Sequence, residues 1–290
     1  MKTKLNKIAN DTNIFLKKFL NKQNNSKLLP AMKYGLFPGG KKIRSKILID
    51  IGSLLAIDYK TLIAIGAAVE CIHAYSLIHD DLPCMDNDKI RRGKPSAHIK
   101  FGESTAVLAG NSLLTMAFEI LSSPTLKISE RIKINLIKKL SECSGHLGIA
   151  GGQYLDLSYE KKKITKNKII EMEIKKTGKL FSFCSAAPAI IKRKNSKEIK
   201  FFENIGSEIG LLFQIADDLL DLEGDEAQVG KRLAKDAEAG KATLPGAMGI
   251  PEARLYAETL VRQAVAKLDC FGSSANLLRD AARFSLQRQS

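Results

Sequence analysis

The sequence predicts an all-α protein, and three observations carry this prediction. Apolar residues recur at helical spacing along most of the chain, no stretch alternates convincingly between apolar and polar residues, and glycine or proline separates the periodic stretches. The helical spacing covers seven segments: Ile8–Phe19, Leu62–Ile78, Ala106–Leu121, Ile132–Leu147, Ile169–Ile190, Phe201–Leu222 and Ala253–Leu268.

Features within and between the helical segments support this prediction. The basic N-terminal stretch lacks a continuous apolar run, so we expect an amphipathic first helix and no secretory signal. Leu62–Ile78 contains Glu70 and His73, which argues against a membrane span. The later helices are separated by breaks, and the glycine and proline breaks fall at Leu36–Gly40, Pro83, Arg91–Pro95, Ser122–Pro124 and Gly224.

The organisation along the chain predicts a single domain over residues 1–290. None of the breaks is a long linker, and no period of 20 to 50 residues repeats. The composition nevertheless changes near residue 224: residues 1–223 hold 31 Lys and 29 Ile, whereas residues 224–290 hold 4 Lys, one Ile and 13 Ala. An alanine-rich terminal helical pair explains this step, and so does a fusion of segments from two sources.

Charge and cysteine content narrow the class of protein. The net charge of +15 suggests a polyanionic partner, for which nucleic acid, an anionic membrane surface and phosphorylated substrates compete. The sequence has no zinc-finger spacing and no aromatic RNA-binding motif, so nucleic acid is not the expected partner. Its 5 cysteines are scattered without a C-x-x-C pair, which argues against a disulfide framework or a zinc site. We therefore expect a cytoplasmic protein without stable membrane insertion.

Two acidic clusters lie on apolar helices about half the chain apart. The first is His79–Asp86, with Asp80, Asp81 and Asp86, and the second is Gln214–Asp221, with Asp217, Asp218 and Asp221. Asp217 and Asp221 share a helix face, and Pro83 disrupts the turn so that Asp86 can fold back toward Asp80. Crowded carboxylates call for a hard cation, and Mg²⁺ binds oxygen ligands while it keeps waters and phosphates. The pattern indicates Mg²⁺ and phosphorylated ligands.

Together with the basic segments Gly39–Arg44 and Lys176–Gly178, these clusters resemble the trans-isoprenyl diphosphate synthases, above all the bacterial farnesyl diphosphate synthases. The resemblance covers nearly the whole chain. It implies the all-α isoprenoid synthase fold, a helical bundle around a central cavity, and a homodimer. It also implies prenyltransferase activity, in which isopentenyl diphosphate condenses head to tail with dimethylallyl or geranyl diphosphate.

The resemblance assigns roles to the acidic residues. Asp80 and Asp86 would bind two Mg²⁺ ions with support from Asp81, and Asp217 would hold a third ion with Asp218 and Asp221 behind it. The metal would act as a Lewis acid for the leaving diphosphate, and the released diphosphate would accept the proton. Thr177 and Gln214 would stabilise cationic charge, so the expected catalytic residues are Asp80, Asp86, Lys176, Thr177, Gln214 and Asp217.

The basic residues divide between two substrates by the same resemblance. The expected allylic site contains Arg91, Lys176, Thr177, Gln214 and Lys231, and the expected isopentenyl diphosphate site contains Lys41, Arg44, His73 and Arg92. The glycines of Gly39–Arg44 suit a loop whose backbone approaches a phosphate. Gly151–Asp156 resembles a segment that lines the family's cavity, with Gln153 and Asp156 as candidates, although its glycines also suit close helix packing.

Product length is expected to depend on side chains about one turn before Asp80. Tyr75 and Ser76 occupy these positions, and a bulky Tyr75 resembles the stop of short-chain synthases, which favours the C15 product. Plain core packing is the alternative for Tyr75. A geranylgeranyl diphosphate synthase is the main alternative function; a terpene cyclase and a non-catalytic subunit are weaker ones, since the second cluster is Asp-rich and both clusters are intact.

The sequence departs from the family pattern at two positions. Ser45 stands where proline is common, and Lys89 replaces an acidic residue after Asp88. Neither change removes an expected ligand. Lys89 is expected to reduce the local negative charge and to weaken Mg²⁺ binding modestly.

Overall fold

The computed structural model describes residues 2–22, 26–37, 39–40, 42–223, 240–276 and 279–280. The described residues are mostly helical, as predicted, and form two compact units, Met1–Ile137 and Lys138–Ser290. Lys41, Lys231 and the composition step at residue 224 lie outside the described residues. Each unit is described by itself below.

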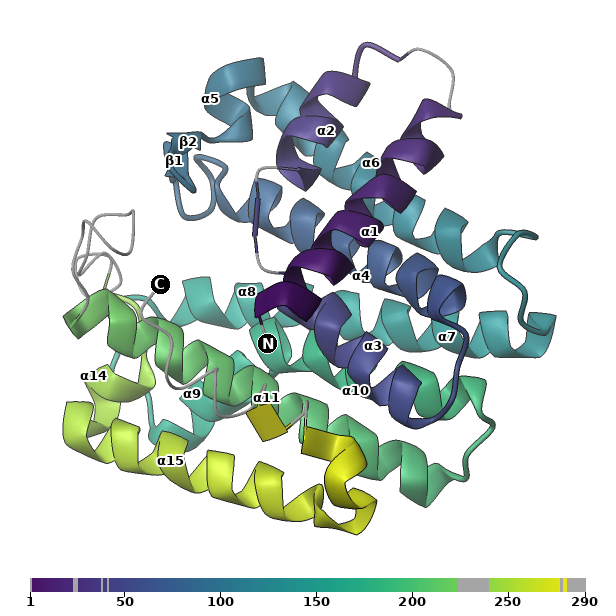
Figure 1. Cartoon of the computed structure of the whole chain (residues 1–290). Helices are drawn as coiled ribbons and strands as arrows, with labels where there is room; N and C mark the ends of the chain where they lie inside the picture. The colour runs from purple at the N-terminus through teal and green to yellow at the C-terminus, as the bar shows by residue number, and fades with distance from the viewer. Residues whose placement is uncertain are drawn as a thin grey trace. The chain divides into compact units, whose positions relative to one another are not determined.

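The first unit is built on α4 (Tyr59–Asp80), against which α1, α2, α3 and α6 pack (Figure 1). Asp58 begins this helix by accepting the backbone N–H of Thr61 at 2.9 Å, a standard N-cap contact. Most of α4 is apolar on all sides and buried, which makes it the core of the unit. The unit contains α1 (Lys2–Asn21), α2 (Leu29–Leu36), α3 (Ile43–Leu54), α4, β1 (Ile90–Arg91), β2 (Lys94–Pro95), α5 (Ala97–Phe101), α6 (Glu103–Ser122) and the start of α7 (Glu130–Ser144).

The antiparallel pair β1 and β2 was not expected from the sequence. Arg92 and Gly93 join the two short strands with φ values of 53° and 71°. Two consecutive positive φ angles are the pattern of a tight hairpin turn. Hydrophobic periodicity could not reveal this turn, because the sequence shows here only a single Gly after two arginines. The hairpin places Arg91 and Arg92 on a fixed support beside the first acidic cluster.

Two helices are long and apolar enough to cross a membrane by length and composition, α4 and α6. The apolar window of α4 is 83% buried within the protein, as expected of a core helix, whereas that of α6 is 44% buried. The exposed side of α6 includes Val107 and Leu108. The apolar helix α6 therefore leaves part of its apolar surface exposed on the first unit.

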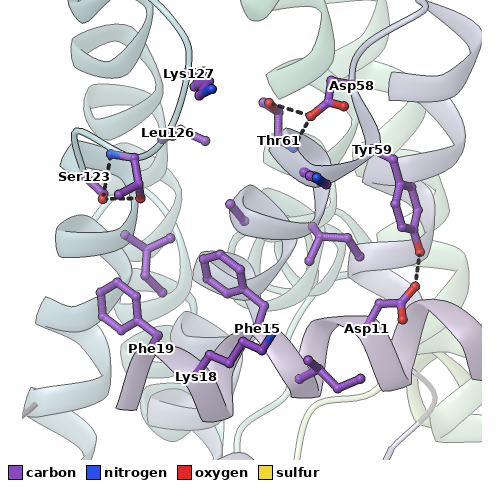
Figure 2. Close-up of a pocket in the computed structure, with 16 residues that line it drawn as sticks. Asp11, Phe15, Lys18, Phe19, Asp58, Tyr59, Thr61, Ser123, Leu126 and Lys127 are labelled. Atoms are coloured by element: carbon purple, nitrogen blue, oxygen red, sulfur yellow. Dashed lines mark hydrogen bonds between the residues drawn. The ribbon is translucent and has the colours of Figure 1, made fainter. Parts of the chain in front are cut away.

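A surface cavity of about 870 Å³ lies between α1, the first turns of α4 and the segment after α6 (Figure 2). Phe15, Phe19 and Leu126 supply apolar walls, and the Tyr59 hydroxyl donates to Asp11 at 2.8 Å on its edge. None of the residues predicted to bind substrate or metal lines this cavity.

The second unit packs its helices around α11 (Ser196–Glu223). The predicted helix Ile169–Ile190 is divided into α9 (Lys166–Glu173), a π-helical turn η1 (Ile174–Gly178) and α10 (Lys179–Ile191). π-helical turns are rare and often mark functional sites. The remaining elements are the end of α7, α8 (Ile149–Tyr159), α14 (Leu244–Met248), α15 (Ile250–Lys267) and the 3₁₀ helix η2 (Asp269–Ala275).

The alanine-rich part of the chain belongs to the core of this second unit. Leu244, Ala253, Ala257 and Leu260 are buried in one apolar cluster with residues of the lysine-rich part, including Leu212. Burial of several aliphatic side chains stabilises a unit by roughly 1.5 to 3 kcal/mol for each large one. The described residues beyond 240 are thus packed with residues 169–219 and do not form a body of their own.

Candidate active site

The first acidic cluster follows the C-terminal end of α4. Asp81 follows the last helical residue, and the chain then turns back so that the backbone N–H of Asp86 donates to the carbonyl of Asp80 at 2.9 Å. The N–H of Asn87 similarly donates to the Leu82 carbonyl at 3.1 Å. The predicted return of Asp86 toward Asp80 is confirmed.

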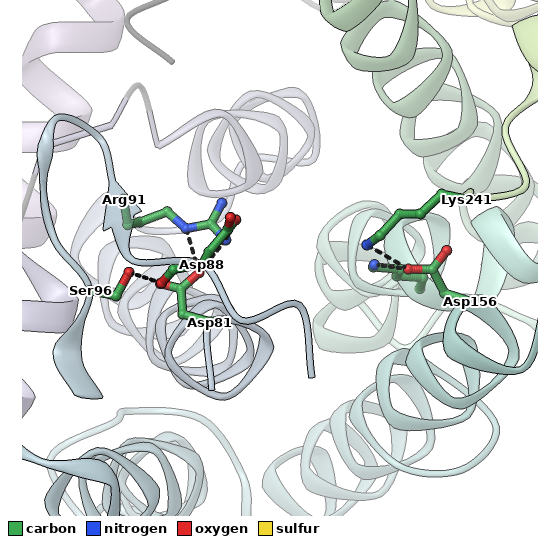
Figure 3. A network of polar contacts seen from close by, with 7 residues as sticks. Asp81, Asp88, Arg91, Ser96, Asp156 and Lys241 are labelled. Carbon is green, nitrogen blue, oxygen red and sulfur yellow. Dashed lines mark hydrogen bonds and ion pairs between the residues drawn. The ribbon is translucent and has the colours of Figure 1, made fainter. Parts of the chain in front are cut away.

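Arg91 of β1 holds Asp81 within this cluster. Its Nε donates to Asp81 Oδ1 at 2.9 Å, and its Nη2 contacts the same oxygen (Figure 3). The same Nη2 lies 3.4 Å from Asp88 Oδ2. Burial raises the pKa of Asp81 above its usual value, although the Arg91 hydrogen bond opposes this shift. Asp81 is buried, whereas Asp80 and Asp86 are partly exposed. Asp80 and Asp86, the two acids of this cluster expected to bind Mg²⁺ with support from Asp81, are therefore accessible, whereas Asp81 is engaged by Arg91.

The loop Gly39–Arg44 approaches the guanidinium of Arg92. Arg92 Nη1 donates to the carbonyl of Gly39, and a Cβ atom on Gly40 would lie only 2.6 Å from the same nitrogen. Gly40 also has φ of 121°, where side chains are disfavoured. The sequence predicted that the backbone of this loop closely approaches a phosphate. In the structure the backbone at Gly39 and Gly40 closely approaches Arg92, a residue of the expected isopentenyl diphosphate site.

Arg44 and His73 of the expected isopentenyl diphosphate site lie in contact. Arg44 Nη1 donates to His73 Nε2 at 3.3 Å, since a guanidinium has no acceptor. Burial, followed by the charges of Arg44, Arg92 and Lys42, lowers the pKa of His73 well below its usual value. His73 is therefore neutral, and the positive charge available to a diphosphate beside it comes from Arg44 and Arg92.

Glu70 is a residue that the sequence analysis did not assign. This buried carboxylate lies 3.4 Å from Lys42 Nζ and accepts the Ser45 hydroxyl at 2.7 Å. Glu70 stands one helical turn before His73 on α4, so it fixes the loop end of α3 beside that histidine. Ser45, the departure from the family pattern, is buried and has a defined hydrogen-bond partner.

Tyr75 is buried on α4 and packs edge-on against His79, with ring centroids 5.7 Å apart. Burial, with a smaller effect of Asp80, raises the pKa of Tyr75 to about 12. His79 Nε2 donates to the Val107 carbonyl at 3.0 Å, and a Cβ on Gly110 would lie 2.1 Å from that nitrogen. The Ser76 hydroxyl donates to the His73 carbonyl at 3.0 Å. Tyr75 is thus buried on α4 against His79, whose ring contacts α6, and this arrangement suits core packing and a chain-length stop equally.

The second acidic cluster is connected to the π-helical turn. The Thr177 hydroxyl donates to Gln214 Oε1 at 2.9 Å, and Gln214 Nε2 donates to Asp218 Oδ1 at 2.8 Å. Asp218 and Asp221 are buried, while Asp217 is partly exposed. Asp217 is again the accessible acid and the expected ligand.

Asp156 of α8 accepts two lysines on one oxygen. Its Oδ2 lies 2.6 Å from Lys176 Nζ and 3.2 Å from Lys241 Nζ (Figure 3 labels Lys241). Burial raises the pKa of Asp156, but the two ammonium groups outweigh this and lower it below its usual value. Lys176 belongs to the predicted allylic site, so Asp156 is joined to that site directly.

The glycines of the same segment allow close packing, which was one of the two interpretations of Gly151–Asp156. A Cβ on Gly152 would lie 2.1 Å from the backbone nitrogen of Lys176. Gln153 is buried, and neither polar atom of its amide has a hydrogen-bond partner among the described residues. Gly152 therefore brings α8 against the π-helical turn.

Glu173 is a second residue that sequence reasoning missed. Burial is the largest cause that raises its pKa well above the usual value, followed by the charge of Asp218 and a hydrogen bond to that carboxylate. Glu173 therefore lies close to Asp218 and forms part of the surroundings of the second cluster. The available signal was an acid between the apolar residues Met172 and Ile174, although Glu171 stands in the same stretch.

Comparison with known proteins places these features in one family. A family model described as polyprenyl synthetase matches residues 25–270. The chain belongs to the polyprenyl synthetase family. It is similar to the farnesyl diphosphate synthase of Escherichia coli, with 39% identity over 91% of this chain and 90% of that one. It is also similar to the geranylgeranyl diphosphate synthase of Cyanophora paradoxa, with 36% identity over 97% and 93%.

Solved structures show the same family at the level of the fold. A synthase of Zymomonas mobilis, described as making farnesyl and geranylfarnesyl diphosphate, matches with a TM-score of 0.89 and 39% identity, covering 98% of both chains. A geranyltransferase of Helicobacter pylori, solved with magnesium and isoprenyl diphosphate, matches with a TM-score of 0.82 and 30% identity, over 98% and 96%. The predicted family, isoprenoid synthase fold and prenyltransferase class are confirmed.

The carboxylates of this polyprenyl synthetase chain fit magnesium. In the parts of the chain that the structure describes, no three acidic, histidine or cysteine side chains converge into a closed metal cluster. Mg²⁺ commonly binds through one or two carboxylates and fills its remaining positions with water and phosphate. The partly exposed Asp80, Asp86 and Asp217 offer that donor set, whereas a zinc-type site would need more protein ligands.

Proposed function

We propose that the chain is a farnesyl diphosphate synthase that condenses isopentenyl diphosphate with dimethylallyl and then geranyl diphosphate to the C15 product. One observation carries the proposal: Asp80, Asp86 and Asp217, the acids expected to bind metal directly, are partly exposed, whereas Asp81, Asp218 and Asp221, expected to support them, are buried. The many curated farnesyl diphosphate synthases of about 40% identity support this function over the geranylgeranyl alternative.

The chain's own residues divide the work as follows. Asp80 and Asp86 would hold two Mg²⁺ ions and Asp217 a third, with Asp81, Asp218 and Asp221 behind them. Bound magnesium supplies Lewis acidity for the departing diphosphate. Arg91, Lys176 and Lys231 bind the allylic diphosphate, and Lys41, Arg44, Arg92 and His73 orient isopentenyl diphosphate.

The Thr177 and Gln214 pair would act on the reacting hydrocarbon. The Thr177 hydroxyl donates its proton to Gln214, so its oxygen lone pairs remain available to stabilise positive charge that develops on the allylic carbon. Asp218 fixes the orientation of the Gln214 amide by accepting from its Nε2. The released diphosphate takes the proton, and no protein base is needed.

Tyr75, with Ser76, would set the product length. Tyr75 is bulky, buried and braced by His79, so it resists displacement by a growing chain. Tyr75→Ala should shift the products from C15 toward C20. The products are separated by chromatography; an unchanged C15 profile from a folded variant would show that Tyr75 is only a packing residue.

A cytoplasmic homodimer is the expected form. The half-exposed apolar face of α6, with Val107 and Leu108, suits a second copy of this chain, because one apolar helix face covered by another removes both from water. Phosphorylated substrates account for the basic charge without a nucleic-acid partner.

The test is an assay of purified protein with Mg²⁺, labelled isopentenyl diphosphate and either dimethylallyl or geranyl diphosphate. A C15 product that disappears with EDTA supports the proposal. A C20 product would identify a geranylgeranyl diphosphate synthase, and no condensation with either starter would favour a cyclase or a non-catalytic subunit.

A further inference from the structure

We propose that Asp156 is a positioning residue that holds Lys176 and Lys241 together as one binding site for the allylic diphosphate. The inference rests on the proposed function and adds to it a positioning role for Asp156, which joins Lys241 to Lys176. Its basis is the arrangement of three charged side chains, from α8, the π-helical turn and the segment before α14.

The geometry concentrates positive charge. Both ammonium nitrogens bind the same Asp156 oxygen, at 2.6 and 3.2 Å, so they lie within about 6 Å of each other. Two like charges this close repel each other unless an anion stands between them. The Asp156 carboxylate is such an anion, and the three groups together carry a net charge of +1.

Burial determines which groups a ligand meets. The Asp156 side chain is 6% exposed, whereas the side chains of Lys176 and Lys241 are 23% and 14% exposed. Solvent, or a diphosphate in its place, therefore reaches the two lysines more readily than the carboxylate. Asp156 acts through the lysines and does not need to touch substrate.

The backbone of Lys176 is fixed independently of Asp156. Gly152 packs directly on the Lys176 backbone nitrogen, and the next residue, Thr177, is tied to Gln214. Removal of the Asp156 charge should therefore release the Lys176 ammonium group without moving the backbone that carries it. The expected consequence is weaker diphosphate binding in a folded protein.

The chain provides a matched control in Asp50. This buried carboxylate on α3 also contacts two lysines, Lys46 by a hydrogen bond and Lys4 at 2.8 Å, and no predicted substrate-binding residue takes part in that cluster. Asp156→Asn and Asp50→Asn are the same chemical change at a buried carboxylate that is shared by two lysines. Only the first is expected to alter substrate binding.

The experiment measures steady-state kinetics and thermal unfolding of the wild-type protein and both variants. Asp156→Asn should raise KM for geranyl diphosphate about tenfold, which is the effect of losing one charge-assisted contact, with KM for isopentenyl diphosphate within about twofold of wild type. Asp50→Asn should lower the unfolding temperature and leave both KM values unchanged. Equal KM values for geranyl diphosphate in Asp156→Asn and wild type would overturn the proposal.

Two additional measurements keep the outcome decisive. Lys241→Met leaves the carboxylate in place and should also raise KM for geranyl diphosphate, so this variant decides the matter if Asp156→Asn does not fold; an unchanged KM then counts against the paired site. Calorimetric titration with inorganic diphosphate requires no turnover. Diphosphate binding that weakens about tenfold in Asp156→Asn supports the site even if the wild type fails to condense isoprenoids, and binding unaltered by the substitution contradicts it.

Discussion

Two buried aspartates of this chain each contact two lysines, but the residues around those lysines differ. Asp50 in the first unit contacts Lys46 and Lys4, and Asp156 in the second contacts Lys176 and Lys241. In both clusters one carboxylate is shared by two ammonium groups. By charge, burial and pairing alone, the two clusters are nearly equivalent.

The difference lies in the lysines and in what surrounds them. The Lys46 side chain is only 3% exposed and is committed to Asp50 within the same helix, while Lys4 ties α1 to that helix. In the Asp156 cluster both lysines reach solvent, and Lys176 adjoins the Thr177 and Gln214 hydrogen bond. The comparison teaches that exposure of the cations does not by itself mark a functional ion pair, since the Lys4 side chain is 36% exposed. What distinguishes the Asp156 cluster is that Lys176 adjoins residues expected to bind substrate.

Removal of one lysine from each cluster gives the largest expected effects. Lys176→Ala should lower kcat/KM for the allylic diphosphate about 10- to 100-fold, because a charged contact to phosphate is lost. Lys46→Ala should cost about 3 kcal/mol of unfolding free energy, because it removes one of the two lysines that contact the buried Asp50 among the described residues. Kinetics and urea unfolding measured on both variants separate the two effects.

The contrast between these variants is itself the test. If Lys46→Ala lost activity as strongly as Lys176→Ala while it remained folded, the distinction between a structural and a ligand-binding cluster would be wrong. The distinction would also fail if Lys176→Ala only reduced stability.

Gly152→Ala tests how the Lys176 backbone is held. The added methyl group would lie 2.1 Å from the Lys176 nitrogen, so α8 and the π-helical turn must separate. Such overpacking costs about 1 to 3 kcal/mol, and KM for the allylic substrate should rise at the same time. Gly178→Ala is the matched control, because its nearest new contact is 3.3 Å away. Equal unfolding free energies for the two variants would contradict the close contact at Gly152.

The sequence predicted most of this organisation, and particular residues show why. Apolar periodicity found the long helices, and Pro83 predicted the return of Asp86 toward Asp80, because both effects are local. The resemblance to a family supplied Lys176, Thr177 and Gln214. In the structure Lys176 contacts Asp156, and the adjacent Thr177 is joined through Gln214 to Asp218.

What the sequence did not predict depends on contacts between distant residues. Asp156 lies 20 residues from Lys176 and 85 from Lys241, and no local pattern encodes such pairs. The π-helical turn at Ile174–Gly178 adds a residue to one turn within an otherwise continuous apolar pattern, so periodicity described one helix. Glu173 looked like an ordinary surface acid because its burial comes from tertiary packing.

Acidification should affect stability through His73 more than through the Asp156 cluster. The lowered pKa of Asp156 keeps this carboxylate ionised between pH 5 and 8. The pKa of His73 is lowered by folding, so below about pH 6.5 the unfolded chain binds a proton that the folded chain does not. The stability present above that pH is therefore lost as the pH falls, by about 1 to 2 kcal/mol between pH 7 and 5.

His73→Asn should remove this part of the pH dependence. Urea unfolding at pH 7 and pH 5 gives the loss of unfolding free energy on acidification for each protein. The contribution of His73 is the loss in wild type minus the loss in the variant. If wild type and variant lost stability in parallel, His73 would not be neutral in the folded protein, and the group beside Arg44 would carry charge.

Ser45 gives the smallest expected effect and extends the comparison to a third buried carboxylate, Glu70. Its partners are one ammonium group, on Lys42, and one hydroxyl, on Ser45. Ser45→Ala should cost about 1 to 2 kcal/mol, because the buried Glu70 loses a hydrogen-bond donor. Ser45→Pro loses the same donor, but proline is tolerated in the first turn of a helix and reduces the entropy of the unfolded chain by about 0.4 to 1 kcal/mol. Unfolding free energies should therefore rank wild type first, Ser45→Pro second and Ser45→Ala last. A proline variant less stable than the alanine variant would mean that α3 begins with a backbone geometry that proline cannot adopt.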